Sequence, residues 1–210
     1  MRQVGRMVVL VAGLLASVPA AGAEIHVLAL GDSLTAGYGL PAADSFVARL
    51  GAALDLPEHD VRIIDAGVSG DTTTGGLARL EWALSGGADA AIVALGANDA
   101  LRGIDPDVTR ANLDRILSVL GQRNIPVLLA GMAAPRNLGT GYVTAFDAIY
   151  PDLADRHGAI LYPFFLDGVA MVPSLNQDDG IHPNARGVEV IVERMVPYVL
   201  RLLERATSGP

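Results

Sequence analysis

Five apolar runs alternate with longer amphipathic segments along the chain. The runs cover residues 25–30, 61–66, 89–96, 125–131 and 159–163, and each is apolar over nearly its whole length. Continuous apolar runs of this kind are typical of parallel strands that are buried on both faces. We therefore interpret them as the strands of one parallel sheet.

Helical patterns lie between these runs. Apolar residues recur at helical spacing over 113–120 and 188–199. Further helix candidates are 41–54, 74–84 and 140–157. Pro197 is predicted to kink the last helix or to end its regular part. The repeated βα order predicts a one-domain α/β fold, with helices on both sides of the sheet and right-handed crossovers.

Composition narrows the classes of function. The 210 residues carry a formal net charge of -8, which argues against a nucleic-acid partner. All 15 basic residues are arginine, and the absence of lysine excludes a phosphate loop with its lysine and a lysine Schiff base. The chain has 0 cysteines and no closely spaced histidine pair, so we expect neither disulfides nor a metal or other cofactor.

The first 23 residues have the pattern of a secretory signal peptide. Arg2 and Arg6 precede an apolar stretch that ends in a small-residue cleavage pattern, Ala-Gly-Ala at 21–23. The alternative is a membrane anchor, but the stretch 7–23 is marginal for spanning a bilayer and contains Pro19. We expect cleavage, a periplasmic or secreted domain over 24–210 without a stable membrane anchor, and a monomer by default.

Polar segments follow the predicted strands where an open parallel sheet binds its ligands, beyond the carboxyl ends of the strands. Segments 31–33, 67–76 and 96–99 come directly after the first, second and third strands. A fourth, 178–184, lies after the last strand and before the C-terminal helix. These four segments are the candidate site.

Their residue types suit acyl transfer, which needs a nucleophile, a base, a group that orients the base, and donors to an oxyanion. Ser33 can be the nucleophile, His182 the base, and Asp179 the group that holds the imidazole tautomer. The backbone N–H groups of Ser33 and Gly70 and the side-chain amide of Asn98 can be the donors.

Each residue, taken alone, also has a structural interpretation. Ser33 suits a turn or a helix cap, Gly70 a left-handed turn, and Asn98 an Asx turn. Asp179 and His182 could simply open the last helix. Only their combination in four separate segments favours catalysis.

Neighbouring polar and aromatic residues are interpreted as structural. Asp32 is expected to cap the helix that begins after the first strand, and its negative charge also disfavours a bound phosphate. Trp82 is expected to lie in the core. The remaining histidines, His26, His59 and His157, are expected to have structural roles.

The four segments resemble the four sequence blocks of the SGNH (GDSL) hydrolase superfamily. The matching residues are "GDSL" at 31–34, Gly70 in "SGDT", Asn98 in "GAND" and "DGIHPN" at 179–184. "SGDTTTGGLARL", "ANDALRGIDP", "AFDAIYPDLA" and "YPFF" are similar to the bacterial periplasmic subgroup of multifunctional acyl-CoA thioesterases, arylesterases and lysophospholipases. Ala97 departs from the pattern, because close relatives often have glycine there.

The resemblance implies a three-layer αβα sandwich of flavodoxin-like topology, with five parallel strands in the order 2-1-3-4-5. It implies a triad of Ser33, Asp179 and His182, and an oxyanion hole formed by Ser33, Gly70 and Asn98.

The resemblance also implies a substrate pocket. Segment 99–106, which contains Leu101, would be a mobile loop over acyl chains. Segment 133–142, which contains Pro135, would form another wall.

The expected function is a serine esterase that cleaves small-molecule carboxylic esters or thioesters through an acyl-serine intermediate. Aryl esters, acyl-CoA-like thioesters and lysophospholipids are the substrate classes implied. Acyl transfer to an alcohol at the same site and a non-catalytic acyl-chain-binding protein stay open as alternatives. A nucleotide-binding flavodoxin-like domain is disfavoured, because lysine and a G-x-G-x-x-G motif are absent.

Overall fold

The computed structural model describes residues 24–55 and 60–208, so the predicted signal peptide at 1–23 lies outside the described residues. The strands are β1 (Ile25–Gly31), β2 (Val61–Gly67), β3 (Ala90–Ala94), β4 (Val127–Ala130) and β5 (Ile160–Tyr162). All neighbours pair in parallel, in the order β2-β1-β3-β4-β5. The predicted parallel sheet and its strand order are therefore confirmed.

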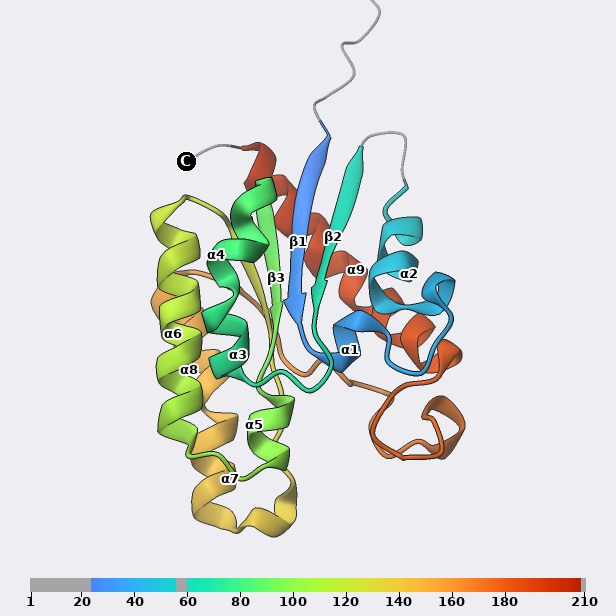
Figure 1. Cartoon of the computed structure of the whole chain (residues 1–210), viewed down its shortest axis with the longest axis vertical. Coiled ribbons are helices and arrows are strands. Elements are labelled where there is room, and N and C mark those ends of the chain that lie inside the picture. The colour runs from blue at the N-terminus through green and yellow to red at the C-terminus, as the bar shows by residue number, and fades with distance from the viewer. Residues whose placement is uncertain (1–23, 56–59, 209–210) are drawn as a thin grey trace, which may run out of the picture.

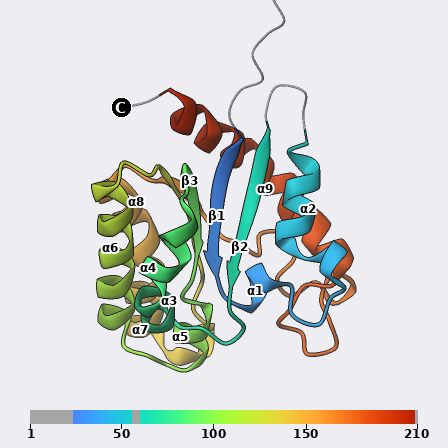
Figure 2. The same cartoon turned by 45° about the horizontal axis from the view of Figure 1, so that its top comes forward.

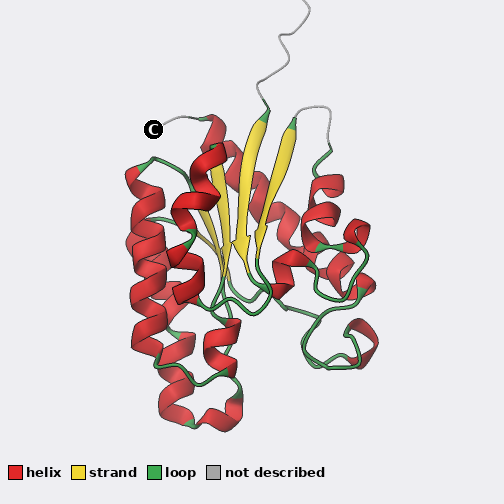
Figure 3. Cartoon of the chain, viewed as in Figure 1, coloured by secondary structure: helices red, strands yellow, loops and turns green. Residues whose placement is uncertain are grey.

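Helices cover both faces of the sheet (Figures 1 and 2). The α-helices are α1 (Ser33–Ala36), α2 (Phe46–Ala53), α3 (Thr73–Ala78), α4 (Leu80–Ala83), α5 (Ala97–Leu101), α6 (Pro106–Gln122), α7 (Thr140–Asp147), α8 (Ile149–His157) and α9 (Ala185–Thr207). Helices α2 and α9 pack together on one face, and α3, α6 and α8 form the layer on the other. The result is the expected three-layer sandwich, with the strands between two helical layers in Figure 3.

Strand position in the sheet explains how completely each strand is buried. Every residue of β3 and β4, in the middle of the sheet, is buried. The edge strand β2 exposes Arg62 and Asp65, because one of its sides has no neighbouring strand. The continuous apolar pattern thus identifies the central strands best.

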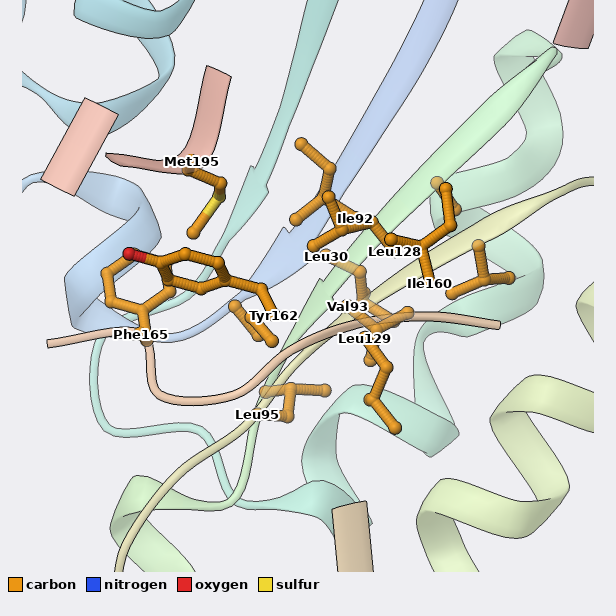
Figure 4. Packing of buried hydrophobic residues seen from close by; sticks show 14 of the residues in the cluster. Leu30, Ile92, Val93, Leu95, Leu128, Leu129, Ile160, Tyr162, Phe165 and Met195 are labelled. Atoms are coloured by element: carbon orange, nitrogen blue, oxygen red, sulfur yellow. The ribbon is translucent and has the colours of Figure 1, made fainter. Parts of the chain in front are cut away.

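The core lies on both faces of the sheet, under α9 on one face and under α6 and α8 on the other. Figure 4 shows this packing, in which aliphatic side chains from four strands meet side chains from α9 and from the segment after β5. The labelled residues are Leu30, Ile92, Val93, Leu95, Leu128, Leu129, Ile160, Tyr162, Phe165 and Met195. A strand framework buried in this way gives the loops at its carboxyl ends a rigid base.

Two local expectations need correction. Of the two outcomes predicted for Pro197, a kink or an end of the helix, the end does not occur, because α9 runs through Pro197 to Thr207. Proline removes one helical N–H donor. Buried Met195 and Val199 on either side keep this face of α9 packed on the core. Trp82 is not a core residue: it is 74% exposed, because α4 turns this side chain outward.

Strand order determines where the site can form. Strand β1 lies between β2 and β3, so the chain must cross over β1 to pass from β2 to β3. The connections that follow β1 and β3 therefore diverge at the switch point of the sheet, where open α/β folds bind ligands. Ser33 follows β1 and Asn98 follows β3, so both lie at this point.

Candidate active site

Ser33, His182 and Asp179 form a hydrogen-bonded chain at the carboxyl edge of the sheet. His182 Nε2 lies 2.9 Å from Ser33 Oγ, and His182 Nδ1 lies 2.6 Å from Asp179 Oδ2. The structure thus brings together residues 149 positions apart in the sequence. These distances suit proton transfer from a hydroxyl to an imidazole that a carboxylate orients.

Local structure presents Ser33 to this chain. Ser33 is the first residue of α1, which begins directly beyond β1 (Figure 1). The preceding residue, Asp32, caps that helix as predicted, since its Oδ1 accepts a hydrogen bond of 3.0 Å from the Leu34 N–H. Ser33 therefore lies at a rigid strand-to-helix junction.

A tight turn presents His182 and Asp179. Asp179 Oδ1 accepts hydrogen bonds from the backbone N–H groups of Ile181, at 2.9 Å, and His182, at 3.0 Å. Bonding from the His182 N–H and side chain, followed by the Ile181 N–H, lowers the pKa of Asp179 to about 2. The carboxylate is therefore ionised at neutral pH. The last helix begins later, with Asn184 as its N-cap, so the pair does not open α9.

Gly70 and Asn98 lie on the connections that follow β2 and β3, and Asn98 lines the cavity that opens next to Ser33. Gly70 has a φ of +83°, the left-handed conformation predicted for it and one that favours glycine. Arg102 Nη2 donates a hydrogen bond of 2.7 Å to the Gly70 carbonyl, which ties this turn to the end of α5.

Asn98 is held by two acceptors on its side-chain nitrogen. Asn98 Nδ2 donates to the Asp71 carbonyl at 2.9 Å and to Asp32 Oδ2 at 3.2 Å. Asn98 also belongs to α5, so the Asx turn does not form. An amide has two N–H donors, so an oxyanion would share or replace one of these bonds. The longer bond, to Asp32, is the weaker of the two.

Asp32 is fully buried beneath the site. Burial raises its pKa to about 6, against the opposing effects of its bonds from the Leu34 N–H and the Asn98 amide. The sequence predicted only the capping contact. The contact with Asn98 spans 66 positions and has no sequence signal of its own.

A second contact missed from the sequence lies under the Gly70 turn. Arg79 Nε lies 2.6 Å from Asp71 Oδ2, and Arg79 Nη2 donates to the Gly31 carbonyl at 2.8 Å. Both side chains are largely buried. This arginine therefore joins the loop after β2 to the end of β1, and its place in the predicted helix 74–84 did not reveal that role.

An apolar cavity of about 190 Å³ opens next to Ser33. Leu101 and Pro135, the two predicted pocket residues, both line it, as does Ala97. The further lining residues are Leu34, Asn98, Met132, Ala133, Phe164, Leu166, Ile181 and His182. The family resemblance predicted the pocket walls at 99–106 and 133–142. Apart from their hydrophobicity, nothing in the sequence indicated that Phe164 and Leu166 line the pocket.

A second hollow, of about 350 Å³, lies at the opposite, amino edge of the sheet, beside Asp89, Val127 and Ala159. It contains none of the predicted catalytic residues. Across 24–55 and 60–208, no cluster of three or more His, Cys, Asp or Glu side chains is arranged to hold a metal ion. In the same ranges, no helix has the length and apolarity needed to cross a membrane.

Two of the other histidines form surface pairs with acidic side chains. His26 Nε2 lies 2.8 Å from Glu24 Oε2, and His157 Nε2 lies 2.7 Å from Asp114 Oδ1. These contacts agree with their predicted structural roles, and His59 lies outside the described residues.

Comparison with known proteins identifies the family. A model of the GDSL-like Lipase/Acylhydrolase family matches residues 29–190. The chain is 38% identical over 185 residues to an arylesterase of Vibrio mimicus. The aligned region covers 88% of this chain and 92% of that protein. The chain is 39% identical over 184 residues to thioesterase 1/protease 1/lysophospholipase L1 of Escherichia coli (strain K12), covering 87% of each.

A solved structure supports the same conclusion. The SGNH-hydrolase family esterase AlinE4 superposes with a TM-score of 0.73 at 49% identity, over 87% of this chain and 98% of that one. The family match, the relatives and the fold agree with one another. The chain therefore belongs to the GDSL-like Lipase/Acylhydrolase family and is a serine ester hydrolase of the SGNH type.

Proposed function

We propose that Ser33 is the nucleophile of this hydrolase, His182 its general base and Asp179 the residue that orients His182. The observation that carries this assignment is the continuous chain of contacts from Ser33 Oγ through both imidazole nitrogens to the Asp179 carboxylate. The ionised Asp179 also stabilises the imidazolium that forms when His182 takes a proton.

In the acylation step, Ser33 Oγ attacks the ester carbonyl carbon while its proton passes to His182 Nε2. The carbonyl oxygen becomes an oxyanion, which accepts hydrogen bonds from the Ser33 and Gly70 N–H groups and from the Asn98 amide. The carbon–oxygen bond to the leaving group then breaks, and His182 returns the proton to the departing alcohol. One such donor typically lowers the barrier by about 3 kcal/mol.

Water completes the cycle. His182 accepts a proton from a water molecule as that water attacks the acyl-serine carbonyl, and the same three donors hold the second oxyanion. The bond to Ser33 Oγ breaks, and the proton passes from His182 back to that oxygen. The products are a carboxylic acid and the free enzyme.

We propose carboxylic esters and thioesters with apolar acyl groups as substrates. The apolar cavity beside Ser33 supports this class, because an acyl chain there would contact Leu101, Met132 and Phe164. Aryl esters, acyl-CoA-like thioesters and lysophospholipids are the specific candidates. The relatives named arylesterase and thioesterase 1/protease 1/lysophospholipase L1 support them.

We also propose that residues 1–23 are removed and that residues 24–210 act in the periplasm or outside the cell. The charged start, apolar centre and Ala-Gly-Ala pattern of the N-terminal segment support this location. Mass measurement of the protein recovered from the periplasm would detect a mature chain that begins at Glu24.

The Ser33→Ala variant tests the assignment of the nucleophile. We expect it to lose hydrolysis of short p-nitrophenyl esters and labelling by a fluorophosphonate probe, with an unchanged circular dichroism spectrum. Ser85→Ala is a matched control, because Ser85 is exposed and follows α4 away from the site. Retained turnover in the Ser33 variant would refute the assignment.

A further inference from the structure

Tyr38 lies next to the imidazole of His182. Its ring centroid is 4.7 Å from that of His182, and the two ring planes are inclined by 40°. The Tyr38 side chain is 53% exposed. Tyr38 does not line the apolar cavity, whereas His182 does. The two sides of His182 are therefore different: one borders the cavity and the other borders an open aromatic ring.

The backbone around Tyr38 is tied to both parts of the site. The Tyr38 N–H donates to the Ser33 carbonyl at 3.1 Å. Gln177 Nε2 donates to the Tyr38 carbonyl at 2.7 Å and to the Pro183 carbonyl at 2.9 Å, which joins Tyr38 to the residue after His182. Gly39 makes room for this bridge, since a Cβ there would lie 2.3 Å from Gln177 Oε1. These bonds fix the backbone that carries the exposed ring.

The reaction geometry determines which part of a substrate reaches this ring. An acyl group that occupies the apolar cavity leaves the carbonyl carbon at Ser33 Oγ. The leaving oxygen must then approach His182 Nε2, because that atom supplies its proton. The rest of the leaving group extends past the imidazole on the side that the cavity does not occupy. Tyr38 is the aromatic side chain that packs against the imidazole.

We propose that Tyr38 is a specificity-determining residue that binds planar aromatic leaving groups, so that the enzyme prefers aryl esters to alkyl esters of the same acid. This inference rests on the proposed function of Ser33 and His182 and names the leaving-group class of that site. Aromatic rings attract one another in offset and edge-to-face arrangements, beyond the area that they bury. An alkyl leaving group gains much less from the same ring.

A purely structural role for Tyr38 makes a different prediction. If its ring only supported His182, removing the ring would slow the alkyl ester at least as much as the aryl ester, because the poorer leaving group depends more on the proton from His182. A leaving-group contact acts only before the alcohol departs, so it affects acylation and is absent from hydrolysis of the acyl-enzyme. The ratio of kcat/KM values for two esters of one acid therefore separates the two roles.

The experiment compares phenyl acetate with ethyl acetate, which share the acyl group and differ only in the leaving group. We expect Tyr38→Ala to lower the kcat/KM ratio of phenyl acetate to ethyl acetate about two- to tenfold, the range that aromatic pairing supplies. Tyr38→Phe, which keeps the ring, should retain the wild-type ratio. Leu101→Ala is a matched control on the acyl side, with the same exposed fraction of 53%, and should leave the ratio unchanged.

The Tyr38 and Ser33 variants together distinguish a failure of the Tyr38 proposal from a failure of the proposed function. An unchanged or raised ratio in Tyr38→Ala, or an equal loss for both esters, overturns the role of Tyr38 if Ser33→Ala is inactive. Hydrolysis of both acetates by the Ser33→Ala variant overturns the proposed function and the leaving-group assignment with it.

Discussion

Asp32 makes two contacts that use its carboxylate, and its burial opposes ionisation of that carboxylate. It caps α1 and also contacts Asn98, so its carboxylate is held next to the site and away from water. Because burial raises the pKa of Asp32 to about 6 from its usual 3.8, ionisation at neutral pH costs stability. The same buried carboxylate orients the Asn98 amide, which is its contribution to the site.

This cost gives a pH-dependent prediction. Between pH 3.8 and 6 the folded protein holds the Asp32 proton and the unfolded chain does not, so stability from this group falls as pH rises through that window. The wild type should lose about 2 kcal/mol between pH 4 and pH 7 relative to Asp32→Asn, which keeps a capping oxygen but does not titrate. Urea unfolding of both proteins at each pH measures this difference, and parallel pH dependences would contradict it.

At the scale of elements, the turn 179–182 acts as one unit. Two backbone N–H groups of the turn bind the Asp179 carboxylate that also holds the His182 ring. The Gln177 N–H donates to the His182 carbonyl at 2.7 Å, which closes the segment on itself. The orientation of His182 therefore depends on the number of residues between it and Asp179.

Inserting one glycine between Gly180 and Ile181 should separate the two residues. We expect kcat/KM for p-nitrophenyl acetate to fall at least a hundredfold, because the imidazole loses its orienting carboxylate. The fold should persist, since Asn184 still caps α9. Circular dichroism and urea unfolding serve as controls for folding. Wild-type turnover in the insertion variant would show that the turn geometry is not required.

At the scale of the whole molecule, the scaffold and the site occupy different regions. The core extends along the sheet to the far end of α9, whereas the site uses only connections at the carboxyl edge. Leu202 is fully buried near the C-terminal end of α9, which packs against the sheet. It contributes to stability without contacting the site.

The Leu202→Ala variant tests this separation. Removing a buried leucine side chain should lower the free energy of unfolding by about 2–5 kcal/mol. The kcat/KM of the folded fraction at 25 °C should remain within twofold of the wild-type value, because no site residue moves. Urea unfolding and initial rates provide the two measurements. A parallel loss of activity below the unfolding transition would show that core packing controls the site directly.

The sequence was most informative where a requirement is local or periodic. Parallel strands buried on both faces must be apolar throughout, so β1, β3 and β4 were recognisable from their runs. The Asp179–His182 pair was recognisable because the two residues lie three positions apart in one turn. The exposed position of Trp82 could not be predicted, because periodicity alone does not show which face of a short helix such as α4 points toward the core.

Patterns along the chain were sufficient to predict the parallel sheet, its helical layers and the residue types needed for acyl transfer, because each depends on neighbours in the sequence. Three contacts are found only in the folded protein: Asp32 contacts Asn98, Arg79 joins Asp71 to the end of β1, and Tyr38 lies against His182. Except for Asp71 and Arg79, which are eight positions apart, these contacts join segments far apart in sequence that meet where the strands end. No pattern along the chain encodes them, because their geometry arises only when the strands take their order in the sheet.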